Sequence, residues 1–415
     1  MQTKLVDFIK NSPQGQEADA ILRSCVHCGF CLATCPTYQI LGDELDSPRG
    51  RIYLMKQMLE GQPVTQKTQL HLDRCLTCRA CETTCPSGVR YGALVDISRG
   101  IVEKRVKRSI RSDLIRYTLR KILPNPLLFN TLFKAGQAVR AILPGKLKSK
   151  IPSTLSPAKL WPTEQHTRKM LALDGCVQPA MAPNINAATA RVLNNLGISL
   201  ITAANAGCCG AVTFHLNAQE EGLDYMRRNI DAWWPLVAQS EVEAIVVTAS
   251  GCGVTVKDYG HLLQHDPVYA KKAADISALA KDISEIIHAE LENIKLLLDK
   301  HNGNARKMKL SFHSPCTLQH GMKIRGVVED ILINTGFDLT SVPNSHLCCG
   351  SAGTYSILQP DLSQQLLKNK VLALESGKPE QIATANIGCL VHLQSGTAVP
   401  VKHWIELLDE CLSSS

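Results

Sequence analysis

The placement of cysteines constrains this chain more than any other feature of its sequence. Two runs near the amino end, CVHCGFCLATCP and CLTCRACETTCP, share the spacing C-x2-C-x2-C-x3-C-P. The chain has 17 cysteines in 415 residues, and its charged opening segment lacks the apolar stretch of a secretory signal. We therefore expect a cytoplasmic protein, in which reductants disfavour disulfides. So many thiols in such a setting indicate metal ligation.

The spacing within each run fits [4Fe-4S] clusters. Three closely spaced thiolates can bind three irons of one cubane, and the proline after the fourth cysteine turns that residue towards a second cluster. The predicted ligands of cluster 1 are Cys25, Cys28, Cys31 and Cys85, and those of cluster 2 are Cys75, Cys78, Cys81 and Cys35. Structural zinc is the alternative. Zinc sites use pairs of closely spaced cysteines, however, and do not explain a third and a fourth cysteine at this spacing in both runs.

A helical segment separates the two runs. It reads SPRGRIYLMKQMLEG, and its apolar residues at helical spacing are Ile52, Leu54, Met55, Met58 and Leu59. A compact ferredoxin has no room for this insertion. We therefore expect residues 1–102 to form a helical two-cluster domain, similar to that of succinate dehydrogenase iron–sulfur subunits. Arg49 and Arg51 either offset the charge of a cluster or lie in solvent.

Residues 103–166 contain no cysteine and carry most of the positive charge. The stretch 104–150 holds thirteen Lys and Arg against one acid, whereas the whole chain has a net charge of +8. Helical apolar spacing interrupted by Pro124 and Pro126 predicts broken helices that link two domains. Basic residues among Leu, Ile and Phe suit an anionic membrane surface or an acidic partner, and a solvated linker is the alternative. Because no nucleic-acid-binding motif accompanies the charge, we expect no such partner.

Residues 167–415 contain an internal duplication, with repeats at about 167–300 and 307–405. Cys176, Cys208, Cys209 and Gly210 recur 140 residues later as Cys316, Cys348, Cys349 and Gly350, and Cys252 recurs as Cys389. In both repeats 31 residues separate the first cysteine from the Cys-Cys-Gly triplet. Such agreement between distant segments indicates two copies of one structural unit.

Matching secondary-structure signals accompany these cysteines. Helices end at Gly197 and Gly336, and strand-like apolar runs precede the cysteines at Met170–Leu173, Ala244–Thr248, Leu310–Phe312 and Ile382–Ala385. Strands that alternate with helices predict an α/β architecture, in which ligands gather outside the carboxyl ends of the strands. The cysteines fall at those ends.

Taken together, these motifs resemble the iron–sulfur subunits of glycolate oxidases, and the repeats resemble the cysteine-rich CCG domain of heterodisulfide reductase. The resemblance covers essentially the whole chain and rests on segments such as GDELDSPRGRIYL, AGCCGAV, TASGCG and SHLCCGSAGTY. It implies a mixed fold, with an N-terminal helical two-[4Fe-4S] ferredoxin domain and a C-terminal duplicated α/β CCG domain.

One departure from the CCG pattern concerns its closing C-x2-C. Thr255 and His392 stand where the fifth cysteine of each repeat belongs. Five-thiolate noncubane clusters are therefore not expected, but four thiolates suffice for a cubane. The possible ligands of one or two further clusters are Cys176, Cys208, Cys209 and Cys252, and Cys316, Cys348, Cys349 and Cys389. Partial or empty sites are the alternative.

Histidines near these cysteines have two interpretations. A histidine ligand would raise the potential of a cluster, but a polar pocket residue is the favoured role for each of them. The histidines in question are His215, His313, His320, His346 and His392. His320 and His346 are the candidates for carrying the proton that accompanies an electron to quinone.

The chain has no nicotinamide fingerprint, P-loop or flavin motif, so chemistry on an organic substrate must lie elsewhere. The resemblance implies FAD-binding partner subunits that oxidise glycolate or other 2-hydroxy acids. This chain would pass their electrons towards quinone, peripherally bound at the cytoplasmic face of the inner membrane. Alternatives are a subunit of glycerol-3-phosphate or lactate dehydrogenase, a thiol–disulfide catalyst, and a structural metal-binding scaffold.

Overall fold

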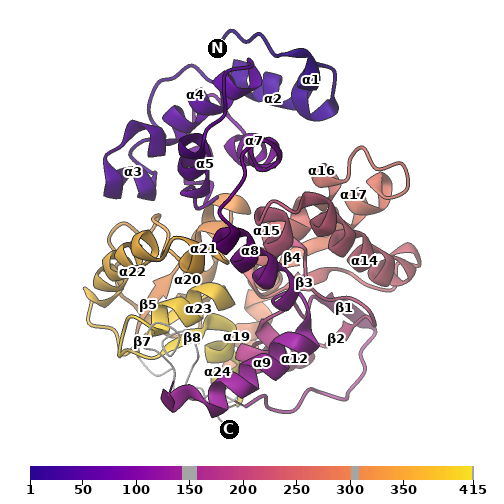
Figure 1. Ribbon diagram of the computed structural model, residues 1–415. Coiled ribbons are helices and arrows are strands. Elements are labelled where there is room, and N and C mark those ends of the chain that lie inside the picture. The colour runs from indigo at the N-terminus through magenta and orange to yellow at the C-terminus, as the bar shows by residue number, and fades with distance from the viewer. Residues whose placement is uncertain (143–156, 301–307, 414–415) are drawn as a thin grey trace.

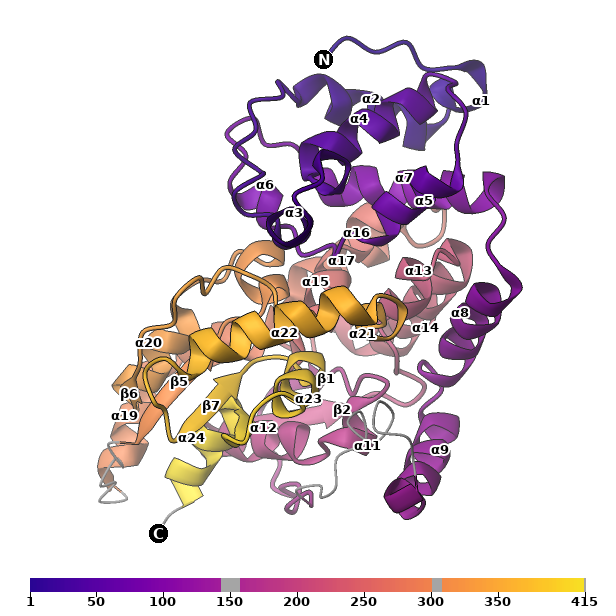
Figure 2. The same ribbon diagram turned by 60° about the vertical axis from the view of Figure 1, so that its left-hand side comes forward.

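The computed structural model describes residues 1–142, 157–300 and 308–413. A helical N-terminal part lies at one end of the molecule, and two α/β units fill the other end (Figure 1). In both views the helices α8 and α9 run from the first part alongside the second (Figure 2). None of the helices in these three ranges is both long and apolar enough to cross a membrane.

The N-terminal part is helical, as predicted. Its helices are α1 (Asp7–Lys10), α2 (Pro13–Ser24), α3 (Pro36–Leu41), α4 (Pro48–Leu59), α5 (Gln66–Asp73), α6 (Ala80–Thr83) and α7 (Tyr91–Arg105), with a 3-10 turn at Glu44–Asp46. Proline stands at the start of α2, α3 and α4, where its missing N–H costs no hydrogen bond. The buried side chains Leu22, Met55, Leu59 and Leu94 form the centre of this part.

The basic segment forms two helices, α8 (Ile110–Ile122) and α9 (Pro126–Ala138), followed by a short turn at Arg140–Ile142. The predicted break between helices is confirmed, because α8 ends before Pro124 and α9 begins at Pro126. Ser109 caps the first helix and Asn125 caps the second. No side chain of α8 is buried, whereas Phe133 of α9 is.

Each repeat contains a four-stranded parallel sheet. The first comprises β1 (Arg168–Ala172), β2 (Ile198–Thr202), β3 (Ile245–Val247) and β4 (Ala280–Asp282), in the order β2-β1-β3-β4. The second comprises β5 (Lys309–His313), β6 (Asp338–Leu339), β7 (Gln381–Thr384) and β8 (Val401–His403), in the order β6-β5-β7-β8. The identical order of strands confirms the duplication. The strands β1, β3, β5 and β7 match the predicted apolar runs.

Helices cover both faces of each sheet. Those of the first repeat are α11 (Gln178–Met181), α12 (Asn184–Asn195), α13 (Ala211–His215), α14 (Gln219–Ala238), α15 (Ser250–Lys257), α16 (Tyr259–Leu262), α17 (Ala270–Leu279), α18 (Ile283–Ala289) and α19 (Leu291–Lys300). The second repeat has a π-turn (Thr317–Gly321), α20 (Val327–Asn334), α21 (Tyr355–Leu358), α22 (Pro360–Glu375), α23 (Ile387–Gln394) and α24 (Trp404–Ser413).

The two repeats share one hydrophobic core. In it α12 packs against α24 and α18 against α20. One face of each sheet points into this shared core, for example Val246 of β3 and Phe312 of β5. The opposite faces carry cores of their own, one containing Val247 and the other Ile382. This alternation along the strands is the period-two pattern of a sheet buried on both faces.

Candidate iron–sulfur sites

The predicted ligands of cluster 1 meet at one small cavity. It is lined by Cys25, Cys28 and Cys31 of the first run and by Cys85 of the second, and Cys81 also reaches it. Cys25 is buried and Cys28 is exposed. The last cysteine of one run therefore lies beside the first three of the other, as the exchange of fourth ligands requires.

The predicted ligands of cluster 2 lie deeper. Cys81 lies close enough to Cys78, Cys75 and Cys35 for a negative charge on any of them to raise its pKa. Burial raises the pKa of Cys78 and of Cys81 well above its usual value. Because several thiolates are costly to bury next to one another, such a set fits a metal centre that supplies positive charge.

The backbone of the two runs adopts the same uncommon conformation at matching positions. His27 and Gly29 have φ of 56° and 85°, and their counterparts Thr77 and Arg79 have φ of 53° and 58°. A β-branched residue rarely adopts positive φ, so Thr77 is strained locally. Left-handed residues within such loops turn successive N–H groups inwards, which makes an anion-binding nest. Thr77 N–H donates to the Cys75 sulfur at 3.4 Å.

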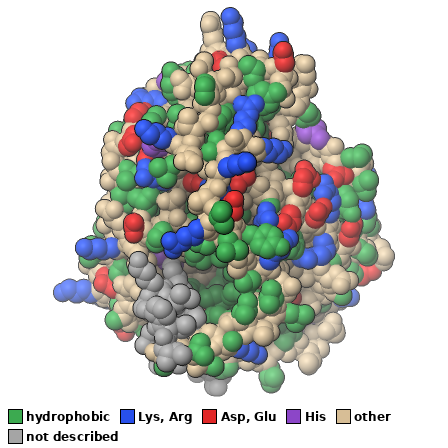
Figure 3. Space-filling view, viewed as in Figure 1, with side chains coloured by type: hydrophobic (Ala, Val, Ile, Leu, Met, Phe, Trp, Pro, Cys, Tyr) green, Lys and Arg blue, Asp and Glu red, His purple; other side chains and the backbone are tan. Residues whose placement is uncertain are grey.

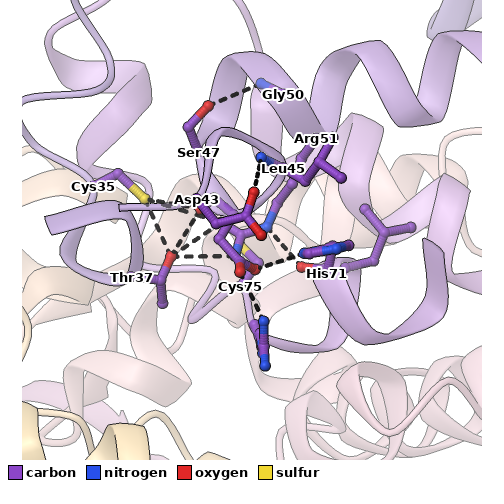
Figure 4. A network of polar contacts seen from close by, with 12 residues as sticks. Cys35, Thr37, Asp43, Leu45, Ser47, Gly50, Arg51, His71 and Cys75 are labelled. Carbon is purple, nitrogen blue, oxygen red and sulfur yellow. Dashed lines mark hydrogen bonds and ion pairs between the residues drawn. The ribbon is translucent and has the colours of Figure 1, made fainter. Parts of the chain in front are cut away.

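A buried charge network supports Cys35 (Figure 4). The Arg51 side chain is 1 % exposed, and it lies 3.9 Å from the Cys35 sulfur and 3.1 Å from Asp46. The Asp46 carboxylate also contacts Arg74 at 2.8 Å and the His71 ring at 3.1 Å. Of the two arginines that the sequence left undecided, Arg51 thus lies beside a predicted ligand, whereas Arg49 is partly exposed and paired with Glu44.

The four cysteines of the first repeat lie together. Cys208 interacts through its side chain with both Cys176 and Cys209, and Cys209 in turn with Cys252. Side-chain hydrogen bonds with Cys176 and Cys209 lower the pKa of Cys208 well below its usual value. The same contact with Cys208 raises the pKa of Cys176 and of Cys209. The cysteines therefore form a chain of close sulfur contacts at the carboxyl ends of the strands.

The second repeat arranges its cysteines in the same way. The sulfurs of Cys316 and Cys348 are 3.8 Å apart, and Cys349 interacts with both Cys348 and Cys389. Gly350 N–H donates to the Cys348 sulfur at 3.4 Å. This glycine has φ of +90°, and a Cβ there would lie 2.6 Å from the backbone oxygen of Ser363. Only glycine fits there, and the sequence signal Cys-Cys-Gly reflects that requirement.

His313 joins the second set of cysteines. One of its ring nitrogens lies within 4.8 Å of the sulfurs of Cys349 and Cys389, and all three residues are buried. Burial lowers the pKa of His313 well below its usual value, so that the ring is neutral. Sequence reasoning treated His313 as a pocket residue, because nothing in the local pattern distinguishes it from the other histidines.

The two proton-carrier candidates have structural partners. His320 Nδ1 lies 3.1 Å from the Thr83 hydroxyl, and its Nε2 lies 2.9 Å from the backbone oxygen of His346. His320 therefore bridges α6 and the second repeat. Of the five histidines, His215 and His392 line the large cavity described next, and His320 and His346 do not.

A cavity of about 1010 Å³ lies where the N-terminal part, α9 and both repeats meet. Its wall includes Cys75 of the second run, Cys209 and Cys252 of the first repeat, and Cys348 and Cys389 of the second. Next to it Cys78 packs in one hydrophobic cluster with Cys316 and Cys348. A cysteine of the N-terminal part and two cysteines of the second repeat thus belong to the same packed region.

Comparison with known proteins agrees with this architecture. A family model described as "4Fe-4S dicluster domain" matches residues 21–89, and one described as "Cysteine-rich domain" matches residues 170–257 and 310–394. These families indicate that the cofactors are iron–sulfur clusters, and the donor chemistry of the four cysteine sets fits them.

Similar full-length proteins are known. The chain is 56 % identical to the glycolate oxidase iron–sulfur subunit of Escherichia coli over 99 % of both chains. It is 30 % identical to a probable glycolate oxidase iron–sulfur subunit of Bacillus subtilis, over 94 % of this chain and 92 % of the other. Lactate utilization protein A of an Exiguobacterium species is 26 % identical over 57 % of this chain and 94 % of its own length. The chain therefore belongs to the family of glycolate oxidase iron–sulfur subunits.

Proposed function

We propose that this protein is the electron-transfer subunit of a glycolate oxidase complex, and that it accepts electrons from an FAD-binding partner subunit. The observation that carries the proposal is that the N-terminal cysteines gather in two sets, in which Cys85 lies near the first run and Cys35 near the second. Flavin releases two electrons whereas a cluster carries one, so that a series of clusters provides their route out. The names and coverage of the full-length relatives support glycolate as the source of those electrons.

The ligand sets of this proposal are those expected from the spacing. Cys85 completes cluster 1 and Cys35 completes cluster 2, within a cluster domain of residues 1–102. The linker of residues 103–166 joins this domain to the duplicated domain of residues 167–415. The cysteines of each repeat hold a further iron–sulfur centre.

Electrons arrive at cluster 1 in this scheme. Cys28 is exposed, and the neighbouring Val26 and Phe30 are 67 % and 62 % exposed. An apolar rim around a surface cluster suits a docked flavoprotein, which would exclude water and shorten the transfer. From cluster 2 the route continues into the second repeat, because Cys78 and Cys316 pack in the same hydrophobic cluster.

Electrons leave through the large cavity to membrane quinone in this scheme. Phe129, Leu132 and Phe133 of α9 give an apolar wall to the cavity that Cys209 and Cys252 also line, which suits the ring and tail of a quinone. The helices α8 and α9 carry exposed apolar residues such as Ile110, Leu114 and Leu127. The face of the molecule drawn in Figure 3 shows apolar side chains together with Lys and Arg, and with some Asp and Glu. Such a surface suits peripheral binding to the anionic cytoplasmic face of the inner membrane.

Anaerobic purification with the flavoprotein subunits provides the test. We expect glycolate to bleach the visible absorbance of the clusters, and iron content above about eight per chain if the repeats are loaded. Paramagnetic resonance of the reduced complex separates the two N-terminal clusters. Cys35→Ser should alter the same signal as Cys75→Ser, and Cys85→Ser the same signal as Cys25→Ser.

Cys411 provides a matched control, because this cysteine lies in α24, outside both runs and both repeat sets. Cys411→Ser should leave every cluster signal unchanged. A colourless protein that contains zinc and no acid-labile sulfide would refute the proposal. If Cys35→Ser altered the signal of Cys25→Ser instead, the exchange of fourth ligands would be wrong.

Lactate is the second candidate substrate of the complex, because relatives named lactate utilization protein A share part of this chain. They cover only 56–57 % of it, whereas the glycolate oxidase relatives cover nearly all of it. Rates of cluster reduction by glycolate, lactate and glycerol 3-phosphate in the purified complex distinguish these substrates. A higher rate with lactate would favour the second candidate.

A further inference from the structure

The two repeats differ at two paired, buried positions near their cysteines. Three residues before its first cysteine, the second repeat has His313 at the end of β5, where the first repeat has Leu173. Five residues before its last cysteine, the second repeat has Thr384 on β7, where the first has Val247. Leu173 and Val247 are both buried in the hydrophobic core that contains Cys209. A pair of apolar residues in one repeat is thus a polar pair in the other.

The polar pair is hydrogen-bonded. His313 and Thr384 are partners in the register of β5 and β7, and His313 Nδ1 lies 2.9 Å from the Thr384 hydroxyl. A histidine that ligates a metal usually engages its other ring nitrogen in this way, which sets the tautomer and the ring orientation. When Nδ1 carries the proton and donates it to the Thr384 hydroxyl, the lone pair of the ring lies on Nε2.

Nε2 has no hydrogen-bond partner within the part of the chain that the structure describes, although His313 is only 2 % exposed. A buried polar atom without a partner is costly unless a ligand satisfies it. One ring nitrogen of His313 and the sulfurs of Cys349 and Cys389 all lie within 4.8 Å of one another. Two donor atoms bound to one tetrahedral metal lie about 3.5–4 Å apart, because each metal–ligand bond is about 2.0–2.3 Å long. The nitrogen and the two sulfurs therefore need to move only slightly closer together to bind one metal.

We propose that His313 is an iron ligand of the second repeat, where its Nε2 binds beside Cys349 and Cys389. The inference rests on the proposed function only in that the repeat holds an iron–sulfur centre. The first repeat, with Leu173 in the same place, holds its centre through cysteine alone. Because four cysteines already supply one ligand to each iron of a cubane, His313 would bind in exchange for one of the four thiolates. A neutral nitrogen in its place leaves the centre less negative, which raises its potential. The second repeat is therefore the more oxidising of the two.

The test uses the full complex, purified without oxygen and labelled with [15N]histidine. Pulsed paramagnetic resonance of the reduced protein should show one strongly coupled imidazole nitrogen. His313→Leu, which copies the first repeat, should abolish that coupling while both N-terminal cluster signals persist. His313→Cys keeps a donor in the event that the leucine variant does not fold, and it should retain the iron, lose the coupling and lower the potential.

His288 serves as the control histidine, because it lies 48 % exposed at the surface and pairs with Asp330. His288→Gln should keep the nitrogen coupling. Persistence of the coupling in His313→Leu, its absence from the wild type, or a second repeat without iron would each overturn the inference. If the coupling is present but glycolate does not reduce the clusters, the proposed function fails and the ligand assignment stands.

Discussion

Substitution of Arg51 tests whether the buried charge network holds the second cluster in place. Arg51→Met keeps the aliphatic length of the side chain and removes its charge and donors. Arg51 contacts Asp46 at 3.1 Å, the Thr37 hydroxyl at 3.2 Å and the backbone oxygen of His71 at 2.7 Å. The substitution would leave the fully buried Asp46 carboxylate with Arg74 as its remaining arginine partner.

The magnitude follows from burial. Loss of one partner of a buried ion pair costs about 3–5 kcal/mol, because the other charge stays out of water. If the substitution lowers the free energy of local opening of α4 and α5 by this amount, amide exchange in these helices accelerates by about 100-fold or more. Each 1.4 kcal/mol corresponds to a factor of ten. The lost positive charge near the Cys35 sulfur, at 3.9 Å, also lowers the potential of cluster 2.

Hydrogen exchange of the anaerobically purified protein, read by mass spectrometry over α4 and α5, measures the effect. Arg49→Met is the control, because Arg49 lies in the same helix but is 35 % exposed in its pair with Glu44. Exposed pairs contribute about 0–1 kcal/mol, so that this variant should change exchange less than about 5-fold. Equal acceleration in both variants would show that the buried network stabilises α4 and α5 no more than the partly exposed Arg49–Glu44 pair does.

Two further predictions concern single residues. Gly350→Ala should reduce the iron content and melting temperature more than Gly353→Ala, because both have positive φ but only the first Cβ meets backbone, at 2.6 Å. Equal losses would contradict the steric argument. Burial lowers the pKa of His403 to about 4, so that its neutral form stabilises the fold above pH 6.5. That stability falls by about 1.4 kcal/mol per pH unit between pH 6.5 and about 4. His403→Gln should flatten this part of the stability curve, and an unchanged slope would refute the reasoning.

Local patterns accounted for much of what the structure contains. Cysteine spacing was sufficient to predict the cluster type and its two-run arrangement, since ligation of a cubane depends on residues a few positions apart. The break at Pro124 and the strands before Cys252 and Cys389 were also predictable, because proline and apolar runs act over single turns and strands. The duplication was visible since both repeats kept the spacing between their first cysteine and the Cys-Cys-Gly triplet.

Long-range packing decided the rest. Arg49 and Arg51 are two positions apart and chemically alike, but α4 turns one into the core and the other towards solvent. His313 meets Cys389 only because β5 pairs with β7 in a particular register. Local sequence signals determine ligand type and spacing, whereas burial and convergence depend on contacts between distant segments, which only the folded chain brings together.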